Sequence, residues 1–326
     1  MPDASTTGPN PSLPSLTLEL PMKLLSMLSL LTSALVCGSI GFFPNRAQAA
    51  ADRFTIEVWT RGSGAYADIE NPPKLKSKTL DVDQLVNAKL FDVQYQKEYE
   101  YRGSFLHEII QRYEPARPSD MILLHFDNKM IVPLPLSIVK QGAFEMFLAR
   151  MIKDGGKFVS DFPKIAKPSD RWRDPRPLVF NGNKLVVSKA WHPGLKKLTP
   201  EGFLPWKSAG SLVGIEWIDS QSYRGQFAFD PKPEVIRGQT VYMERCVFCH
   251  AVRQVGGRLG WDFVDPLPIF QKRTEQTLHS HVKYPKLDAL ERGLMMPTQP
   301  DFTDEDAAAL WYWMRAAATH PLKKYE

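Results

Sequence analysis

Between residues 52 and 225, short apolar runs alternate with polar turns, which is the pattern of buried and half-buried strands. Segments with strand character are Phe54–Trp59, Leu80–Leu85, Met121–Phe126, Lys129–Leu134 and Leu212–Trp217. Lys129–Leu134 is expected to form a hairpin with the segment before it. Residues 101–113 begin with a turn and continue as an amphipathic helix. The pattern predicts a mixed α/β domain of mostly short strands over residues 50–228.

A further hairpin is expected within Pro177–Val187, because Asn181 and Gly182 form a turn sequence between two apolar runs. Prolines at 231 and 233 stiffen the chain just after this domain, and the join to the next domain is expected there.

Residues 231–326 follow a helical period instead. Residues 233–242 are expected to form a first helix. A last helix is expected after Thr303, which has the character of an N-cap with Asp306 three residues later. Apolar side chains then recur at helical spacing through Met314. The predicted fold class is α+β, with a mixed α/β N-terminal domain followed by an all-α domain.

A targeting segment precedes both domains. Met22 and Lys23 open a long apolar run that ends in small residues, and this is the pattern of a secretory signal. We expect residues 1–49 to be an N-terminal extension and signal peptide, with the signal at 22–49 and cleavage after Ala49. Translation could start at Met1 or Met22. An uncleaved membrane anchor is the alternative, since the run approaches spanning length. Cys37 lies inside the signal and is expected to be discarded.

Composition and charge narrow the range of functions that the chain could have. The chain has 326 residues, of which 43% are hydrophobic and 24% charged, as in a soluble globular protein. The net charge is +5 and the sequence pI is about 8.9. No run of Lys and Arg is long enough to argue for nucleic-acid binding. A mildly basic chain suits docking to an acidic protein partner or association with an anionic membrane surface.

Cys246, Cys249 and His250 form a C-x-x-C-H pattern, which is typical of covalent haem attachment. Two thiols three positions apart on one helical turn can reach the two vinyl groups along one porphyrin edge. The histidine directly after them supplies the proximal nitrogen to the iron. A zinc site needs further Cys or His ligands at close spacing, and no second C-x-x-C exists. A disulfide and a thioredoxin-type dithiol are weaker alternatives, because the βαβ context of the latter is missing. The sequence predicts one covalently bound haem c and its iron.

Residues 231–326 resemble a small class I cytochrome c along their whole length. Gly238 and Tyr242 precede the haem cysteines at the family's offset. In that family, the glycine lets the first helix cross the last one closely. Residues 293–297 resemble the Met-Pro loop, which implies Met296 as the distal iron ligand, with its neighbour Met295 as the alternative.

Several other residues are candidates for roles around the expected haem. His279 and His281 are rivals for the sixth iron position, but residues at i and i+2 do not share a helix face, so we expect surface histidines. The resemblance also implies a proline carbonyl that accepts a hydrogen bond from His250, with Pro266 and Pro268 as candidates. Arg258 or Trp261 could bind a haem propionate.

Parts of residues 52–225 resemble the molybdopterin-binding fold of the sulfite oxidase group. The similar pieces include residues 101–106, 177–182 and 205–208. That family binds molybdenum through a cysteine thiolate, and no cysteine occurs between residues 50 and 245. We therefore expect no molybdenum. His107, His125 and His192 lie in unlike settings and are read as isolated histidines rather than a metal site.

The leading hypothesis is an exported, periplasmic, monohaem c-type cytochrome that acts in electron transfer. Its N-terminal domain would dock a redox partner, such as a dehydrogenase, an oxidase or another cytochrome, or bind a small molecule. The alternative is a haem-containing subunit or fused dehydrogenase of the sulfite oxidase type. A haem-based sensor, in which a small ligand displaces Met296, is a third hypothesis.

Overall fold

The computed structural model describes residues 54–60, 76–113, 119–140, 146–165, 179–180, 182–187, 209–284, 296, 299 and 301–320. All of them belong to one compact unit that runs from Pro44 to Glu326. The predicted signal, Met295 and His192 lie outside the described residues. Among the residues described, no helix is long and apolar enough to cross a membrane.

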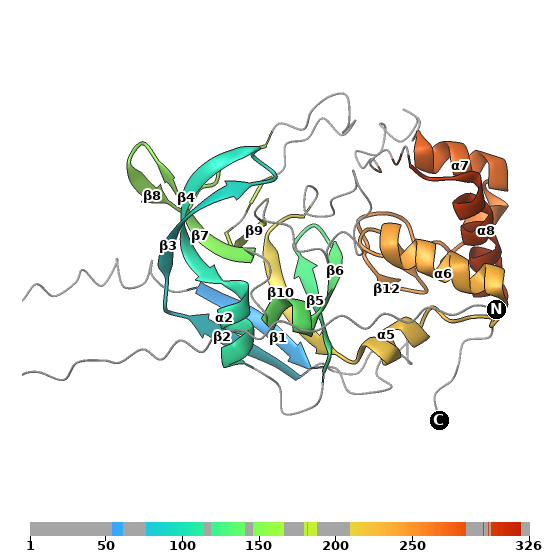
Figure 1. Cartoon of the computed structure of the whole chain (residues 1–326), viewed down its shortest axis with the longest axis horizontal. Coiled ribbons are helices and arrows are strands. Elements are labelled where there is room, and N and C mark those ends of the chain that lie inside the picture. The colour runs from blue at the N-terminus through green and yellow to red at the C-terminus, as the bar shows by residue number, and fades with distance from the viewer. Residues whose placement is uncertain are drawn as a thin grey trace, which may run out of the picture. The chain divides into compact units, whose positions relative to one another are not determined.

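The first sheet has five strands in the order β2-β1-β10-β5-β6 (Figure 1). Its members are β1 (Phe54–Thr60), β2 (Lys76–Val82), β5 (Met121–Phe126), β6 (Ile131–Pro135) and β10 (Leu212–Ile218). β10 lies parallel to β1, and the other neighbours are antiparallel. The expected hairpin of β5 and β6 is confirmed. The parallel pair brings together segments from the two ends of the predicted mixed α/β domain.

The second sheet is built from the middle of the chain. Its members are β3 (Val86–Asp92), β4 (Lys97–Phe105), β7 (Met146–Asp154), β8 (Lys157–Val159) and β9 (Lys184–Val187). The strands follow the order β3-β4-β7-β8, and β9 also pairs with β7. The expected turn at residues 101–103 is wrong, because these residues lie inside β4. Gly103 is needed for pairing rather than for turning: a Cβ there would lie 2.0 Å from the carbonyl oxygen of Leu148.

The predicted hairpin within Pro177–Val187 is also wrong. Val179 and Phe180 form no strand, and β9 pairs antiparallel with β7 instead. Gly182 and Asn183 have positive φ angles of +88° and +39°, while Asn181 lies outside the described residues. The partner of a strand depends on burial and contacts across the sheet rather than on the local turn signal alone.

Short helices join the sheets. α2 (Leu106–Arg112) follows β4 and α3 (Leu136–Lys140) follows β6, each with its apolar side chains buried. α5 (Ser220–Gly225) follows β10, and the Asp219 side chain caps it by accepting from the Ser222 N–H.

The C-terminal region is helical, as expected. It contains α6 (Pro233–Arg245), α7 (Glu275–Lys283) and α8 (Asp304–Thr319), with the short strands β11 (Ala251–Val252) and β12 (Val255–Gly256) and the 3-10 turn η2 (Ile269–Gln271) between α6 and α7. Thr303 and Asp306 form the predicted capping box at the start of α8. A mixed region of strands and short helices is thus followed by a helical region, which confirms the predicted α+β fold class.

α6 and α8 cross in close contact at Gly238 (Figure 1). A Cβ on Gly238 would lie 2.1 Å from the Ala309 carbonyl oxygen and 2.5 Å from Trp313 Cβ, so only glycine fits. The Tyr242 ring stacks on Trp313 beside the crossing, with ring centroids 4.4 Å apart. Gly238 therefore allows the close helix crossing that was expected of it, and the Tyr242 ring packs beside that crossing.

Candidate haem site

The haem-attachment motif continues the last turn of α6. The Cys246 N–H donates to the Tyr242 carbonyl, and the His250 N–H donates to the Cys246 carbonyl at 2.9 Å. These bonds place both thiols and the imidazole within one compact turn. The two cysteines are not bridged to each other. Burial raises the pKa of both thiols to about 12, so they are held as neutral thiols.

The His250 ring is oriented by a backbone carbonyl. Its Nδ1 lies 2.8 Å from the Trp261 oxygen. A carbonyl oxygen can only accept, so Nδ1 carries the hydrogen and Nε2 presents its lone pair. This is the tautomer that a metal-binding imidazole needs. The expected acceptor was wrong: it is the carbonyl of Trp261, and not that of Pro266 or Pro268.

Close backbone packing fixes the same ring from the side. A Cβ on Gly260 would lie 2.3 Å from Cε1 of His250. Gly257 is equally confined, since its Cβ would lie 1.9 Å from the Phe248 carbonyl oxygen. These two glycines let the backbone approach the proximal histidine and the attachment motif closely.

Electrostatics favour the neutral imidazole. Burial lowers the pKa of His250, and this effect outweighs the opposing influence of the Trp261 carbonyl and the Asp262 carboxylate. A neutral imidazole with a free Nε2 is a suitable axial ligand for haem iron. The donor set of two thiols and one oriented imidazole therefore fits haem c, which supplies a one-electron iron couple when bound.

The segment that carries the expected distal ligand is tied to the end of α6. Arg245 donates from both terminal nitrogens to Oδ2 of Asp301, each at 3.1 Å. Gln299 in the same segment is only 2% exposed. Met296 is half-buried and packs against the hydrophobic core of this region. Met295 lies outside the described residues, so the choice between the two methionines remains a prediction.

His279 is a structural residue of α7. Its Nδ1 lies 2.6 Å from Oδ1 of Asp304, and its Nε2 lies 3.3 Å from the Phe302 carbonyl oxygen. Both ring nitrogens therefore face the start of α8, and neither is available to iron.

His281 was expected to be a surface residue, and in the structure it is half-buried. It lies on the face of α7 that also carries the buried Leu278 and Val282. Its pKa is lowered to about 4, mainly by burial and in part by nearby positive charge such as that of Arg273. Sequence reasoning missed this, although the spacing i, i+3, i+4 with two apolar residues could have indicated it.

Of the three histidines considered in the N-terminal region, His192 lies outside the described residues and the other two lie on different elements. His107 lies on α2 and His125 on β5, where its Nε2 lies 2.8 Å from the buried Glu216 carboxylate. Among the described residues, no group of three His, Cys, Asp or Glu side chains could hold a metal ion.

Comparison with known proteins supports the haem site. Residues 233–314 match the family model described as cytochrome C oxidase, cbb3-type, subunit III. These residues form a c-type cytochrome domain. The match begins at the first residue of α6 and ends inside α8, so it includes the attachment motif and the α6–α8 crossing. A search of curated proteins gives no significant match.

The cytochrome domain indicates a haem-binding electron-transfer protein with a covalently attached haem c. The expected C-terminal c-type cytochrome domain is confirmed. The match does not extend to residues 52–225, and nothing supports the expected likeness of that region to sulfite oxidase.

Proposed function

We propose that the protein is an exported monohaem cytochrome that carries single electrons to or from a protein partner. The observation that carries this proposal is the His250 ring, whose Nδ1–H is bound by the Trp261 carbonyl at 2.8 Å. This leaves Nε2 with a lone pair that can bind a metal, and the two thiols of the same turn are not bridged to each other. Export rests on the signal pattern at residues 22–49, with cleavage after Ala49.

Each ligand has a proposed role. Cys246 and Cys249 form thioethers with the haem vinyl groups, and His250 is the proximal ligand. Met296 is the distal ligand, because its side chain packs against the core and its segment is anchored through Asp301 to Arg245. A thioether favours reduced iron, so this ligand raises the potential relative to a second histidine.

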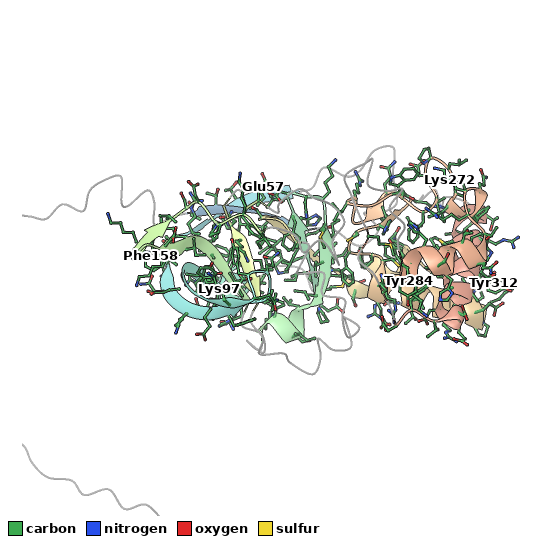
Figure 2. All side chains as sticks on the ribbon, turned by 90° about the horizontal axis from the view of Figure 1, so that it is seen from above. Glu57, Lys97, Phe158, Lys272, Tyr284 and Tyr312 are labelled. Atoms are coloured by element: carbon green, nitrogen blue, oxygen red, sulfur yellow. The ribbon has the colours of Figure 1, made fainter. Side chains whose placement is uncertain are left out.

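A docking surface is proposed next to the proximal histidine. The Trp261 side chain is 53% exposed, although its carbonyl holds His250. Lys272 places its Nζ 4.3 Å from the centre of the Trp261 ring. Figure 2 shows Lys272 at the surface. Aromatic and positive groups of this kind suit a partner with an acidic face.

The N-terminal region is proposed to bind a partner or a small molecule rather than molybdenum. It contains no cysteine between residues 50 and 245 that could ligate that metal. A mildly basic protein of this kind could also associate with an anionic membrane surface.

The deciding experiment uses protein produced in a host that matures c-type cytochromes. A pyridine haemochrome spectrum with iron and molybdenum analysis is expected to give one covalent haem per chain and no molybdenum. N-terminal sequencing of the exported protein is expected to start at Ala50. Colourless protein with Cys246 and Cys249 joined in a disulfide would overturn the proposal.

The distal ligand can be tested separately by comparing two variants. Met296→Ala is expected to lower the reduction potential and to let carbon monoxide bind rapidly to the reduced haem. Met295→Ala is the matched control and is expected to change both properties much less. Equal effects of the two substitutions would remove the assignment of Met296.

A further inference from the structure

A buried acid and a buried amine meet inside the second sheet. Asp92 is the last residue of β3 and Lys184 is the first of β9. The Lys184 Nζ lies 2.5 Å from Oδ2 of Asp92, and both side chains are fully buried. β3 and β9 are not hydrogen-bonded neighbours in the sheet, so this side-chain contact joins strands that the backbone ladder leaves apart.

The amine of Lys184 is buried between aromatic rings, whose faces attract a cation but do not replace hydrogen-bond acceptors. The Lys184 Nζ lies 5.0 Å from the centre of the Tyr95 ring and 4.7 Å from that of Phe180. Within the described part of the chain, Asp92 is its only hydrogen-bond acceptor. An ammonium has three donors, and burying it with one acceptor is costly. Burial accordingly lowers the pKa of Lys184, against the opposing effect of Asp92, and this favours the neutral, nucleophilic amine.

The two oxygens of the Asp92 carboxyl group accept hydrogen bonds from different donors. Oδ1 accepts from the backbone N–H groups of Gln94 and Tyr95, at 2.7 and 3.3 Å. Oδ2 accepts from the Tyr101 hydroxyl at 2.7 Å. Paired backbone donors on one oxygen stabilise negative charge as an oxyanion hole does. A hydroxyl on the other oxygen can deliver a proton to it as it leaves.

We propose that Lys184 and Asp92 condense to form an intramolecular isopeptide bond. The Nζ–Cγ bond forms and the Cγ–Oδ2 bond breaks. One proton first passes from the Lys184 ammonium to the carboxyl group, which gives the neutral amine. The nitrogen loses a second proton as it bonds to Cγ, and both protons leave with Oδ2 as one water molecule. Tyr101 donates its proton to Oδ2 during departure and recovers one from the nitrogen. The step is redox-neutral and needs no other reactant, and it replaces two buried charges by a neutral amide.

The bond would close a covalent loop that contains residues 93–183. Cross-links across long loops stabilise a fold mainly by restricting the unfolded chain. The proposal is independent of the haem, because every participating group lies in or next to the second sheet.

The test is mass spectrometry of the full-length holoprotein after proteolysis under denaturing conditions. The expected result is one branched peptide that joins the segments around Asp92 and Lys184, lighter by the mass of one water than the two linear peptides together. Detection of both linear peptides unmodified, with no branched product, would overturn the proposal.

Three variants sharpen this result. Lys184→Arg retains the positive charge but cannot form the amide, so it is expected to give only linear peptides. Asp92→Asn is expected to form the same branched peptide with loss of ammonia instead of water. Tyr101→Phe keeps both reacting groups and is expected to slow the reaction, so that linear peptides persist in freshly made protein.

A branched peptide that forms equally fast in Tyr101→Phe would contradict the role of the hydroxyl. If a variant does not fold, the wild-type peptides still decide the question.

Discussion

The cytochrome domain and the second sheet both bury reactive groups, but they orient them by different means. In the cytochrome domain, the two thiols and the imidazole lie within five consecutive residues. Backbone atoms fix their positions, namely the Trp261 carbonyl and the glycines that allow close approach. In the sheet, Asp92 and Lys184 are 92 residues apart, and strand register brings them together. Local backbone N–H groups and the Tyr101 hydroxyl then hold the carboxyl group.

This difference implies different sensitivities to mutation. A site built from one turn depends on the few residues that contact that turn. A site assembled from distant strands depends on the pairing of the whole sheet, because register places each side chain on its face. The predictions below test this contrast, in order of decreasing effect.

The largest effect is expected for Asp92→Ala. The substitution leaves the Lys184 amine buried without its only acceptor in the described part of the chain, and it removes the proposed amide. Loss of one partner from a buried pair costs about 3–5 kcal/mol of unfolding free energy. Denaturant unfolding followed by circular dichroism measures the loss. The haem absorption spectrum is expected to be unchanged while the protein is folded.

A double variant provides the control for that result. Asp92→Leu combined with Lys184→Met replaces both polar groups with apolar ones and is expected to recover part of the lost stability. If the double variant were less stable than Asp92→Ala, the buried unpaired amine would not be the source of the destabilisation.

Gly238→Ala is expected to have the next largest effect. The new methyl group would clash with the Ala309 carbonyl and with Trp313 at the helix crossing. Overpacking of this kind costs about 1–3 kcal/mol, which exceeds the gain of about 0.5–1 kcal/mol in helix propensity. Thermal unfolding followed by haem absorbance measures it. Gly225→Ala is the control, since a Cβ there meets nothing within 4 Å. Equal effects would show that the crossing tolerates a side chain.

Gly260→Ala is expected to perturb the haem more than the fold. Its methyl group would displace the His250 ring, so the proximal bond and the reduction potential should change. Optical and magnetic spectra of the oxidised protein, with a potentiometric titration, measure this. A displaced ring with an unchanged potential and spectrum would contradict the proximal role of His250.

The smallest effect is expected for Asp120→Ala. Asp120 accepts from the Ser220 backbone N–H at 2.6 Å and from its hydroxyl at 2.5 Å, at the start of α5. Burial raises the pKa of this carboxyl, but the bonds from Ser220 and the charge of Arg224 outweigh it and lower the pKa overall. Because the group is exposed, the loss at neutral pH should be about 1 kcal/mol or less.

The pH dependence of that loss has a defined sign. A lowered carboxyl pKa in the folded protein stabilises it at every pH above the ordinary pKa of aspartate. This contribution disappears as the pH falls through the folded-state pKa. The difference in stability between wild type and Asp120→Ala should therefore be constant near neutrality and shrink in acid. A difference that grew on acidification would contradict the assignment.

Local signals in the sequence predicted the cytochrome domain well. The C-x-x-C-H motif, the glycine at 238 and the capping box at Thr303 each act over a few residues. Gly238 and the capping box have the expected structural role, and haem attachment at the motif stays a prediction. The acceptor for His250 was not predictable, because any carbonyl in a glycine-rich loop can reach the ring. Trp261 was selected by the path of the loop rather than by its side chain.

The second sheet was predicted less accurately, and the reason is physical. Strand partners depend on contacts between distant segments, so the apparent hairpin at Asn181 and Gly182 gave the wrong partner for β9. The Asp92–Lys184 pair was missed altogether. Neither residue has a local signature, and only the folding of distant strands into one sheet brings them together.

The position of α8 has a consequence for biosynthesis. α8 packs against α6 through Gly238 and Trp313, but it is translated after the attachment motif at residues 246–250. Until α8 has been made and has packed, the crossing at Gly238 cannot form. Cys246 is only 5% exposed in the finished fold, so we expect the haem to be attached before this region has packed completely.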